Sequence, residues 1–172
     1  MPNLTIIVER RVIISSRKFE DVIASIHAAI GHPDLPAFWK AVADASTYAE
    51  LHGIMHGAVG HSGLMEFVRF DHGQFLQKTQ NNNTHPDAIP RIVRFVVGNP
   101  LIMVAMATHV HDAGSYAPVT LLVDERDGAV RLSYDTMSSY LGGYGSPAAL
   151  RVAAELDARV EALMTAAAGP SL

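Results

Sequence analysis

The spacing of apolar residues in the first third of the chain predicts one strand followed by three helices. Residues 4–14 alternate between apolar and polar positions and are rich in β-branched side chains, which is typical of a strand. The apolar positions would form one buried face, with Arg10 as an exception. Apolar side chains at helical spacing follow over residues 19–30. Asp34 is suited to cap a second helix, and Thr47 begins the capping-box sequence of a third.

The rest of the chain contains four more strand patterns and two clear helix starts. Strands are predicted over residues 64–70, 91–97, 116–124 and 129–135. The last two form a hairpin, because Asp127-Gly128 between them is a strong turn signal. Helices are predicted to begin at Asn99-Pro100 and at Ser146-Pro147. The segments 78–90, 109–115 and 136–145 are predicted to be loops.

This order of elements predicts an α+β fold. We expect two layers, with helices packed on one face of a mixed or antiparallel sheet of about five strands. The length of 172 residues fits one domain, so we take 1–172 as a single domain. The extra helices at about 32–62 are interpreted as an elaboration of that domain.

Composition excludes several classes of function. The net charge is −4 and the basic residues are scattered, so a nucleic-acid partner is not expected. No apolar run approaches the roughly 20 residues that span a bilayer, so no membrane partner is expected. The absence of cysteine excludes disulfides, thiolate metal sites and a cysteine nucleophile, and it favours a cytoplasmic location.

Gly98-Asn99-Pro100 places the start of a helix at the end of a strand. Free N–H groups and the helix dipole at such a junction favour an anion, and the Asn99 amide could bind a ligand directly. The alternative is a structural strand-to-helix turn, because Pro100 removes one of the donors.

Glu66 and Arg94 lie within predicted strands, among apolar neighbours. If their strands are adjacent, the two side chains could pair across the sheet. A partly buried Glu66 would then be a candidate general acid or base. The alternative is an ion pair on the solvent face of the sheet.

Nine histidines are the unusual feature of the composition. His52 and His56 lie four residues apart on a predicted helix, which suits two imidazole ligands of one metal. No third ligand is defined, although His61, Asp71 and His72 are candidates. The alternative is a solvated polar helix face.

Two further polar groups fall near the ends of predicted elements. His109 and His111 follow the helix that begins at Asn99 and could line the mouth of a pocket. Tyr134 and Asp135 open a polar, glycine-rich run that extends to Gly145, and such a loop can close over a ligand.

Four segments together resemble the bacterial domain-of-unknown-function family 302. They are GLMEFVRFD (63–71), VGNPLI (97–102), AGSYAPV (113–119) and LSYDTMSSY (132–140). The resemblance implies a compact two-layer α+β fold and a homodimer. It implies no established activity, cofactor or catalytic residue.

Two functions are therefore considered. The first is binding of a small polar or anionic ligand in a pocket formed by Asn99, His109, His111 and the run from Tyr134. The second is a histidine-ligated metal or haem protein, with or without catalytic activity. An enzyme without metal, using Glu66 or His109 as base, has less support because no nucleophile or phosphate-loop motif is present.

Overall fold

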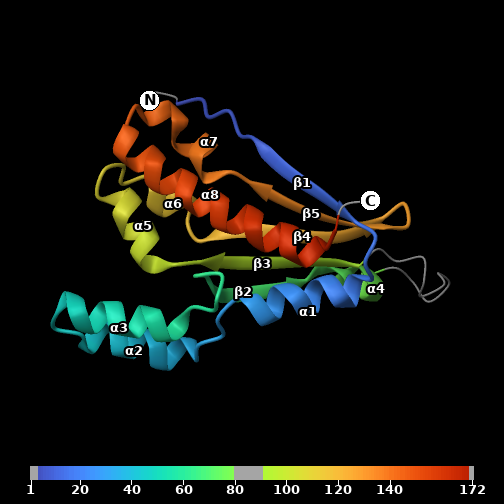
Figure 1. The fold of residues 1–172 in the computed structure, drawn as a ribbon, viewed down its shortest axis with the longest axis horizontal. Coiled ribbons are helices and arrows are strands. Elements are labelled where there is room, and N and C mark those ends of the chain that lie inside the picture. Colours follow the sequence, from blue (N-terminus) through green and yellow to red (C-terminus); the bar gives the residue numbers. More distant parts are fainter. Residues whose placement is uncertain (1–3, 80–90, 171–172) are drawn as a thin grey trace.

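The computed structural model describes residues 4–79 and 91–170 and shows an α+β fold around one antiparallel sheet (Figure 1). The predicted loop at 78–90 therefore lies almost entirely outside the described residues. The strands are β1 (Arg10–Ser15), β2 (Met65–Asp71), β3 (Ile92–Gly98), β4 (Val119–Arg126) and β5 (Ala129–Asp135). They lie side by side in the order β1-β5-β4-β3-β2, and every neighbouring pair is antiparallel. The predicted fold class is confirmed.

The helices begin where the sequence places capping residues. The side chains of Asp34, Thr47, Asn99 and Ser146 each accept a hydrogen bond from a backbone N–H of the helix that follows. The helices in the first half of the chain are α1 (Phe19–Ala29), α2 (Leu35–Asp44), α3 (Tyr48–Ala58) and α4 (His72–Thr79). Those in the second half are α5 (Pro100–Ala107), α6 (Ala113–Tyr116), α7 (Met137–Leu141) and α8 (Pro147–Ala168).

Two segments predicted to be loops contain short helices. The segment 109–115 leads into α6, and the segment 136–145 contains α7 and a 3₁₀ turn, η2 (Gly142–Tyr144). The cap of α7 comes from a distant residue: the carboxylate of Asp157 on α8 accepts from the backbone N–H groups of Met137 and Ser138 at 2.7 and 3.0 Å. A local sequence pattern cannot reveal such a cap.

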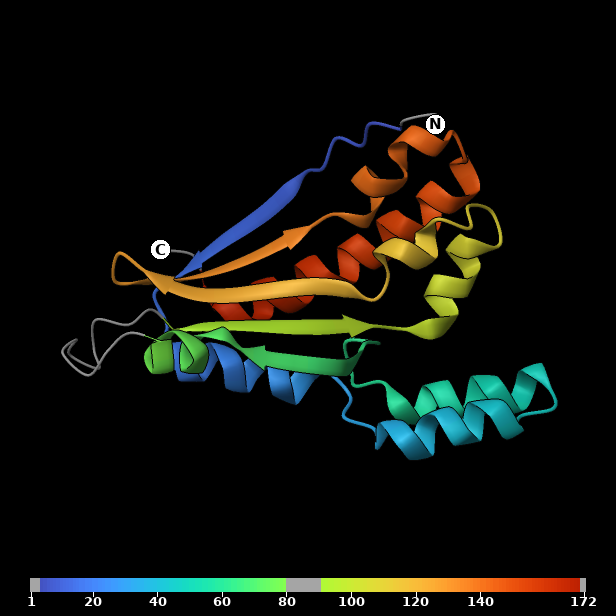
Figure 2. The same ribbon diagram turned by 180° about the vertical axis from the view of Figure 1, so that it is seen from behind.

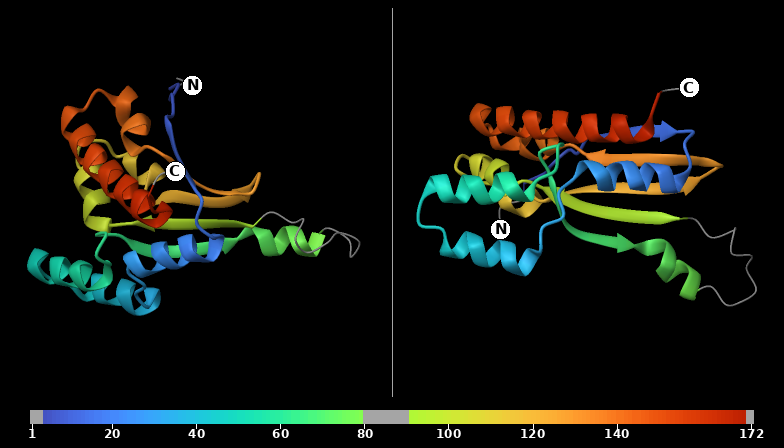
Figure 3. Two further views of the ribbon diagram at one scale, coloured as in Figure 1. Left: turned by 45° about the vertical axis from the view of Figure 1, so that its right-hand side comes forward. Right: turned by 60° about the horizontal axis from the view of Figure 1, so that its bottom comes forward.

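Helices α1 and α8 lie side by side over one face of the sheet (Figure 3, right). The main core fills the space between these helices and the sheet, and it includes Val22 and Ile26 of α1 with Phe95, Leu121 and Leu132 of the strands. Seen from behind, the strands lie in front of α8 (Figure 2). We call the helix-covered side the closed face and the opposite side the open face.

Strand β1 corrects the prediction for the N-terminal segment. It begins at Arg10, and residues 4–9 are not in a strand. Ile13 packs against the core, whereas Val12 and Ile14 are 39% and 64% exposed. The prediction that this face is buried is therefore wrong, because it is part of the open face. Arg10, the charged exception in the apolar pattern, lies on the same face and fits its exposure to solvent.

Helices α2 and α3 form an antiparallel pair with a small core of its own. Phe38, Met55 and Ala58 pack together with Met65 of β2, and Leu101 of α5 lies against them. The pair extends from one end of the sheet (Figure 3, left). Across the described ranges, no helix combines the length and apolar character needed to cross a membrane.

Candidate functional site

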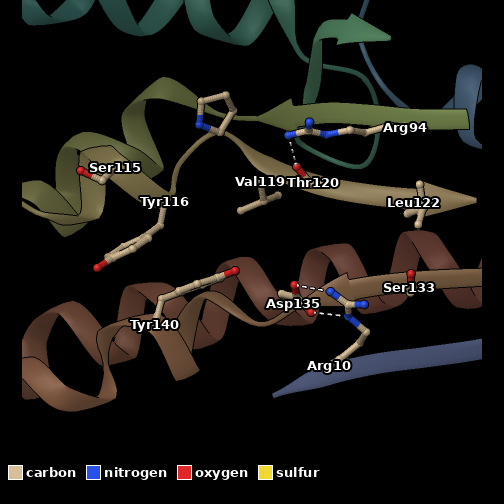
Figure 4. Close-up of a pocket in the computed structure, with 11 residues that line it drawn as sticks. Arg10, Arg94, Ser115, Tyr116, Val119, Thr120, Leu122, Ser133, Asp135 and Tyr140 are labelled. Carbon is tan, nitrogen blue, oxygen red and sulfur yellow. Dashed lines mark hydrogen bonds and ion pairs between the residues drawn. The ribbon is translucent and has the colours of Figure 1, made fainter. Parts of the chain in front are cut away.

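The open face of the sheet contains a hollow of about 420 Å³ near the ends of the central strands (Figure 4). We call it the polar pocket. Its volume falls within the range typical of small-molecule sites. It is lined by Arg10, Arg94, Ser115, Tyr116, Pro118, Val119, Thr120, Leu122, Ser133, Asp135 and Tyr140.

Strand register brings the floor of this pocket together. Arg94 of β3 lies opposite Leu122 of β4, which in turn lies opposite Ser133 of β5. Asp135 of β5 lies opposite Arg10 of β1. Directly opposed residues in an antiparallel sheet point to the same face, so these side chains all project from the open face. Helices α6 and α7 close one end of the pocket.

Two of the charged groups in the pocket neutralise each other. The Arg10 guanidinium donates Nε and Nη2 to the two carboxylate oxygens of Asp135 at 2.6 and 2.7 Å. The hydrogen bonds to Asp135 raise the pKa of Arg10 above its ordinary value. This bidentate pair spans the edge of the sheet and contributes no net charge.

Arg94 is the remaining charge, and no carboxylate among residues 4–79 and 91–170 forms an ion pair with it. Its Nη2 donates to the Thr120 hydroxyl at 3.1 Å. Its Nε is buried and has no hydrogen-bond partner in the described part of the chain. The guanidinium carbon lies 5.7 Å from the centre of the Phe70 ring. The pocket therefore has one uncompensated positive charge at its floor.

Tyrosines form the wall at the helical end. The rings of Tyr116 and Tyr140 stack, with centroids 4.8 Å apart and planes inclined by 14°. The hydroxyl groups of Tyr116 and Tyr144 form a hydrogen bond of 2.7 Å. Burial raises the pKa of Tyr140 above its ordinary value, so its phenol is neutral near pH 7 and can donate a hydrogen bond into the pocket.

A second hollow of about 220 Å³ adjoins the polar pocket. We call it the apolar hollow. Its lining combines Trp39 of α2 and Phe67 of β2 with methionines of α5, and it includes no charged side chain. Pro118 and Val119 line both cavities.

The predicted site residues are divided between the two faces. Arg94 and Asp135 both line the polar pocket. Tyr134 does not, because neighbouring residues of a strand point to opposite faces. Its side chain is buried in the closed-face core, and its hydroxyl donates to Asp157 at 2.7 Å. Burial and the nearby Asp157 carboxylate raise the pKa of Tyr134, so this phenol stays neutral.

The predicted pairing of Glu66 with Arg94 is wrong. Glu66 lies opposite Val97, a closed-face residue, whereas Arg94 lies opposite Phe70. The register shifts between Glu66 and Val68, which indicates a bulge. The alternation of faces along β2 is therefore interrupted between Glu66 and the part of the strand that pairs with Arg94. On the closed face, Glu66 Oε1 lies 3.4 Å from Arg69 Nε, and Glu66 Oε2 lies 3.9 Å from His32 Nδ1.

Asn99, His109 and His111 also lie outside the polar pocket. The Asn99 amide accepts from Leu101 N at 3.0 Å and donates to the Gly63 carbonyl at 3.1 Å, so both of its polar atoms are used in the fold. These bonds favour the interpretation of Gly98-Asn99-Pro100 as a structural strand-to-helix turn over its interpretation as an anion site. His109 and His111 are exposed and line neither hollow.

His52 and His56 are exposed on α3. Within residues 4–79 and 91–170, no cluster of three or more histidine, aspartate or glutamate side chains is arranged to hold a metal ion. The candidate third ligands do not complete the pair.

Sequence reasoning included Tyr140 within the polar run but missed Arg10, Thr120, Ser133 and Tyr116 as pocket residues. The available signal was polar residues in the alternating positions of apolar strands. Ser133 and Asp135 show it, and so does Arg10. This signal identifies a pocket only once the strand register is known. The sequence of a single strand does not show which of its two faces lies on the same side of the sheet as the polar face of its neighbour.

Comparison with known proteins places the fold in context. A crystal structure of an uncharacterized conserved DUF302 protein from Bacillus stearothermophilus matches with a TM-score of 0.63 at 14% identity, covering 92% of this chain and 97% of that chain. At this identity the likeness shows a shared fold. No functionally curated protein matches the chain.

The family described as "Domain of unknown function DUF302" matches residues 40–167. Segments 113–119 and 132–140, which carry part of the resemblance in the sequence, supply seven of the eleven residues that line the polar pocket. Since the match covers well over half of the sequence, the chain belongs to the DUF302 family.

Proposed function

We propose that this protein binds a small organic acid in the polar pocket, with a single carboxylate held by Arg94. The observation that carries the proposal is the uncompensated charge of Arg94 at the pocket floor. Arg10 is already paired with Asp135 through two hydrogen bonds. One positive charge without a partner matches one negative charge on a ligand.

The hydrogen-bonding state of Arg94 supports an anionic ligand. A buried cationic donor without an acceptor is costly, because its hydration is lost without replacement. The Nε of Arg94 is in this position. A carboxylate is planar and can accept two N–H groups of a guanidinium at once, so it is a well-matched ligand for this side chain.

The other polar groups of the pocket are hydroxyls, which suit the same ligand. Thr120 already accepts from Arg94, so its own proton is directed elsewhere. Ser133 lies on the floor, and Tyr140 is a neutral phenol on the wall. These groups can donate to a carboxylate or to a hydroxyl of the ligand, while the stacked tyrosine rings provide a flat apolar surface.

A thermal-shift and calorimetric panel of monocarboxylates, dicarboxylates, sulfonates and inorganic phosphate tests the proposal. We expect monocarboxylates to stabilise the wild type. The Arg94→Gln variant should lose about tenfold or more in affinity, because hydrogen bonds to charged groups contribute about 1.5–3 kcal/mol. Arg151→Gln is the matched control, since Arg151 is exposed on α8 and lines neither hollow.

Equal binding to wild type and Arg94→Gln would rule out the proposed role of Arg94. Binding of phosphate in preference to every carboxylate would also contradict it. No observation favours the histidine-ligated metal or haem alternative, and it is not carried further.

The homodimer implied by the family resemblance is also part of the proposal. The open face carries exposed apolar side chains on both edge strands: Val12 and Ile14 on β1, and Val68 and Phe70 on β2. A second copy covering these edges would bury them and enclose the polar pocket. Light scattering after size exclusion tests this, with Ile14→Glu expected to shift the mass towards that of one chain.

A further inference from the structure

The apolar hollow offers a ligand neither charge nor a free side-chain amide. It is lined mainly by Trp39, Phe67, Met103, Met106, Pro118 and Val119. Asn99 also contributes to its wall, but both polar atoms of that amide already form hydrogen bonds within the protein. A polar occupant would lose its hydration without replacement, whereas an apolar occupant would gain from burial.

The position of this hollow identifies what could fill it. Pro118 and Val119 line both the apolar hollow and the polar pocket, so the two cavities adjoin at the start of β4. The guanidinium of Arg94 on β3 donates a hydrogen bond to the hydroxyl of Thr120, which follows Val119 on β4 (Figure 4). The two cavities therefore share a wall at Pro118 and Val119, and Arg94 is bonded to the residue that follows this wall in the chain.

We infer that the ligand is an amphipathic monocarboxylic acid whose carboxylate binds Arg94 and whose hydrocarbon part enters the apolar hollow beside Trp39. This inference rests on the proposed function, and it adds the class of acid. Methionines of α5 suit such an occupant, because their flexible, polarizable side chains adapt to hydrocarbon chains of different shape.

A series of straight-chain acids from acetate through butyrate and hexanoate to octanoate tests the inference. Affinity should rise about fourfold for each methylene that enters the hollow, as expected from the burial of hydrocarbon. Trp39 is the single tryptophan of the chain and is 47% exposed. Its fluorescence should therefore change with hexanoate and octanoate but not with acetate.

Variants separate the two ends of the ligand. Met103→Gln keeps the length of the side chain but adds a polar amide to the hollow, so octanoate affinity should fall towards that of butyrate while acetate affinity is unchanged. Val104→Thr is the control, because Val104 is exposed on the same helix and does not line the hollow. Arg94→Gln should weaken every acid, and neutral octanol should bind the wild type more weakly than octanoate.

The outcomes distinguish this inference from the proposed function. If acids bind through Arg94 with an affinity independent of chain length, the apolar hollow is not part of the site and only the general proposal stands. If octanoate binds equally well to wild type and Arg94→Gln, the hollow acts alone and the joint site is wrong. If no acid of any length binds, both proposals fail.

Discussion

The two faces of the sheet use the same strands for different purposes. On β3, Phe95 is buried in the closed-face core while its neighbour Arg94 is a charged group on the floor of the polar pocket. On β5, Tyr134 is held by Asp157 inside the protein while Asp135 pairs with Arg10 on the open face. One residue of displacement along a strand thus separates a group that holds the fold from a group available to a ligand.

Asp157 on the closed face and Arg94 on the open face also differ in how far their hydrogen bonding is satisfied. On the closed face, the Asp157 carboxylate receives the Tyr134 hydroxyl and two backbone N–H groups. On the open face, the Arg94 guanidinium has Thr120 as its hydrogen-bond partner, and its Nε has none within the described ranges. A polar side chain in a partly buried position is informative about function when its bonding is incomplete.

The largest expected contrast comes from adjacent leucines of β4. Leu121 is 0% exposed in the closed-face core, whereas Leu122 is half-buried on the floor of the polar pocket. Leu121→Ala should lower the free energy of unfolding by about 3 kcal/mol, because it leaves a cavity in a packed core. Leu122→Ala should cost about 1 kcal/mol, since the side chain is only partly covered. Urea unfolding of both variants measures the difference, and equal losses would contradict the assignment of faces.

Asp157→Ala tests whether the polar group of the closed face is structural. The change leaves the Tyr134 hydroxyl and the N-terminal N–H groups of α7 without their acceptor, so unfolding free energy should fall by about 2–3 kcal/mol. Glu155→Ala, an exposed position on the same helix, should change it by less than about 0.5 kcal/mol. A matching loss in both variants would show that the effect comes from the helix and not from the buried carboxylate.

Asp135→Asn should strengthen the binding of an acid. Removal of the carboxylate charge leaves Arg10 and Arg94 both positive at the pocket, and a partly exposed charge changes affinity by about threefold. Glu161→Gln removes an equal charge from the ion pair with Arg11, outside the pocket, and should leave affinity unchanged. Calorimetry with butyrate compares the two, and weaker binding to Asp135→Asn would indicate that Asp135 itself contacts the ligand.

The sequence predicts those features that depend on neighbouring residues. Asn99 and Thr47 act as caps in the structure because the hydrogen bond of a cap closes within three residues. The pocket depends on contacts between distant segments. Arg10 and Asp135 are 125 residues apart, and only strand order brings them together. The Glu66 prediction failed at a bulge, where alternation along the strand no longer indicates the face.

The smallest expected effect concerns the edge of the closed face. There the rings of His27 on α1 and His32 stack, with their centroids 3.8 Å apart. Burial, and then the nearby His32, lower the pKa of His27 below its ordinary value of 6.5. As pH falls through 6.5, the unfolded chain therefore takes up a proton before the folded chain does, and stability decreases. His27→Gln removes this contribution, so its unfolding free energy should decline less than that of the wild type between about pH 7 and pH 5. Parallel urea titrations across that range provide the measurement. Identical slopes would mean that folding does not lower the pKa of His27, which would contradict the assignment of a desolvated ring at this edge.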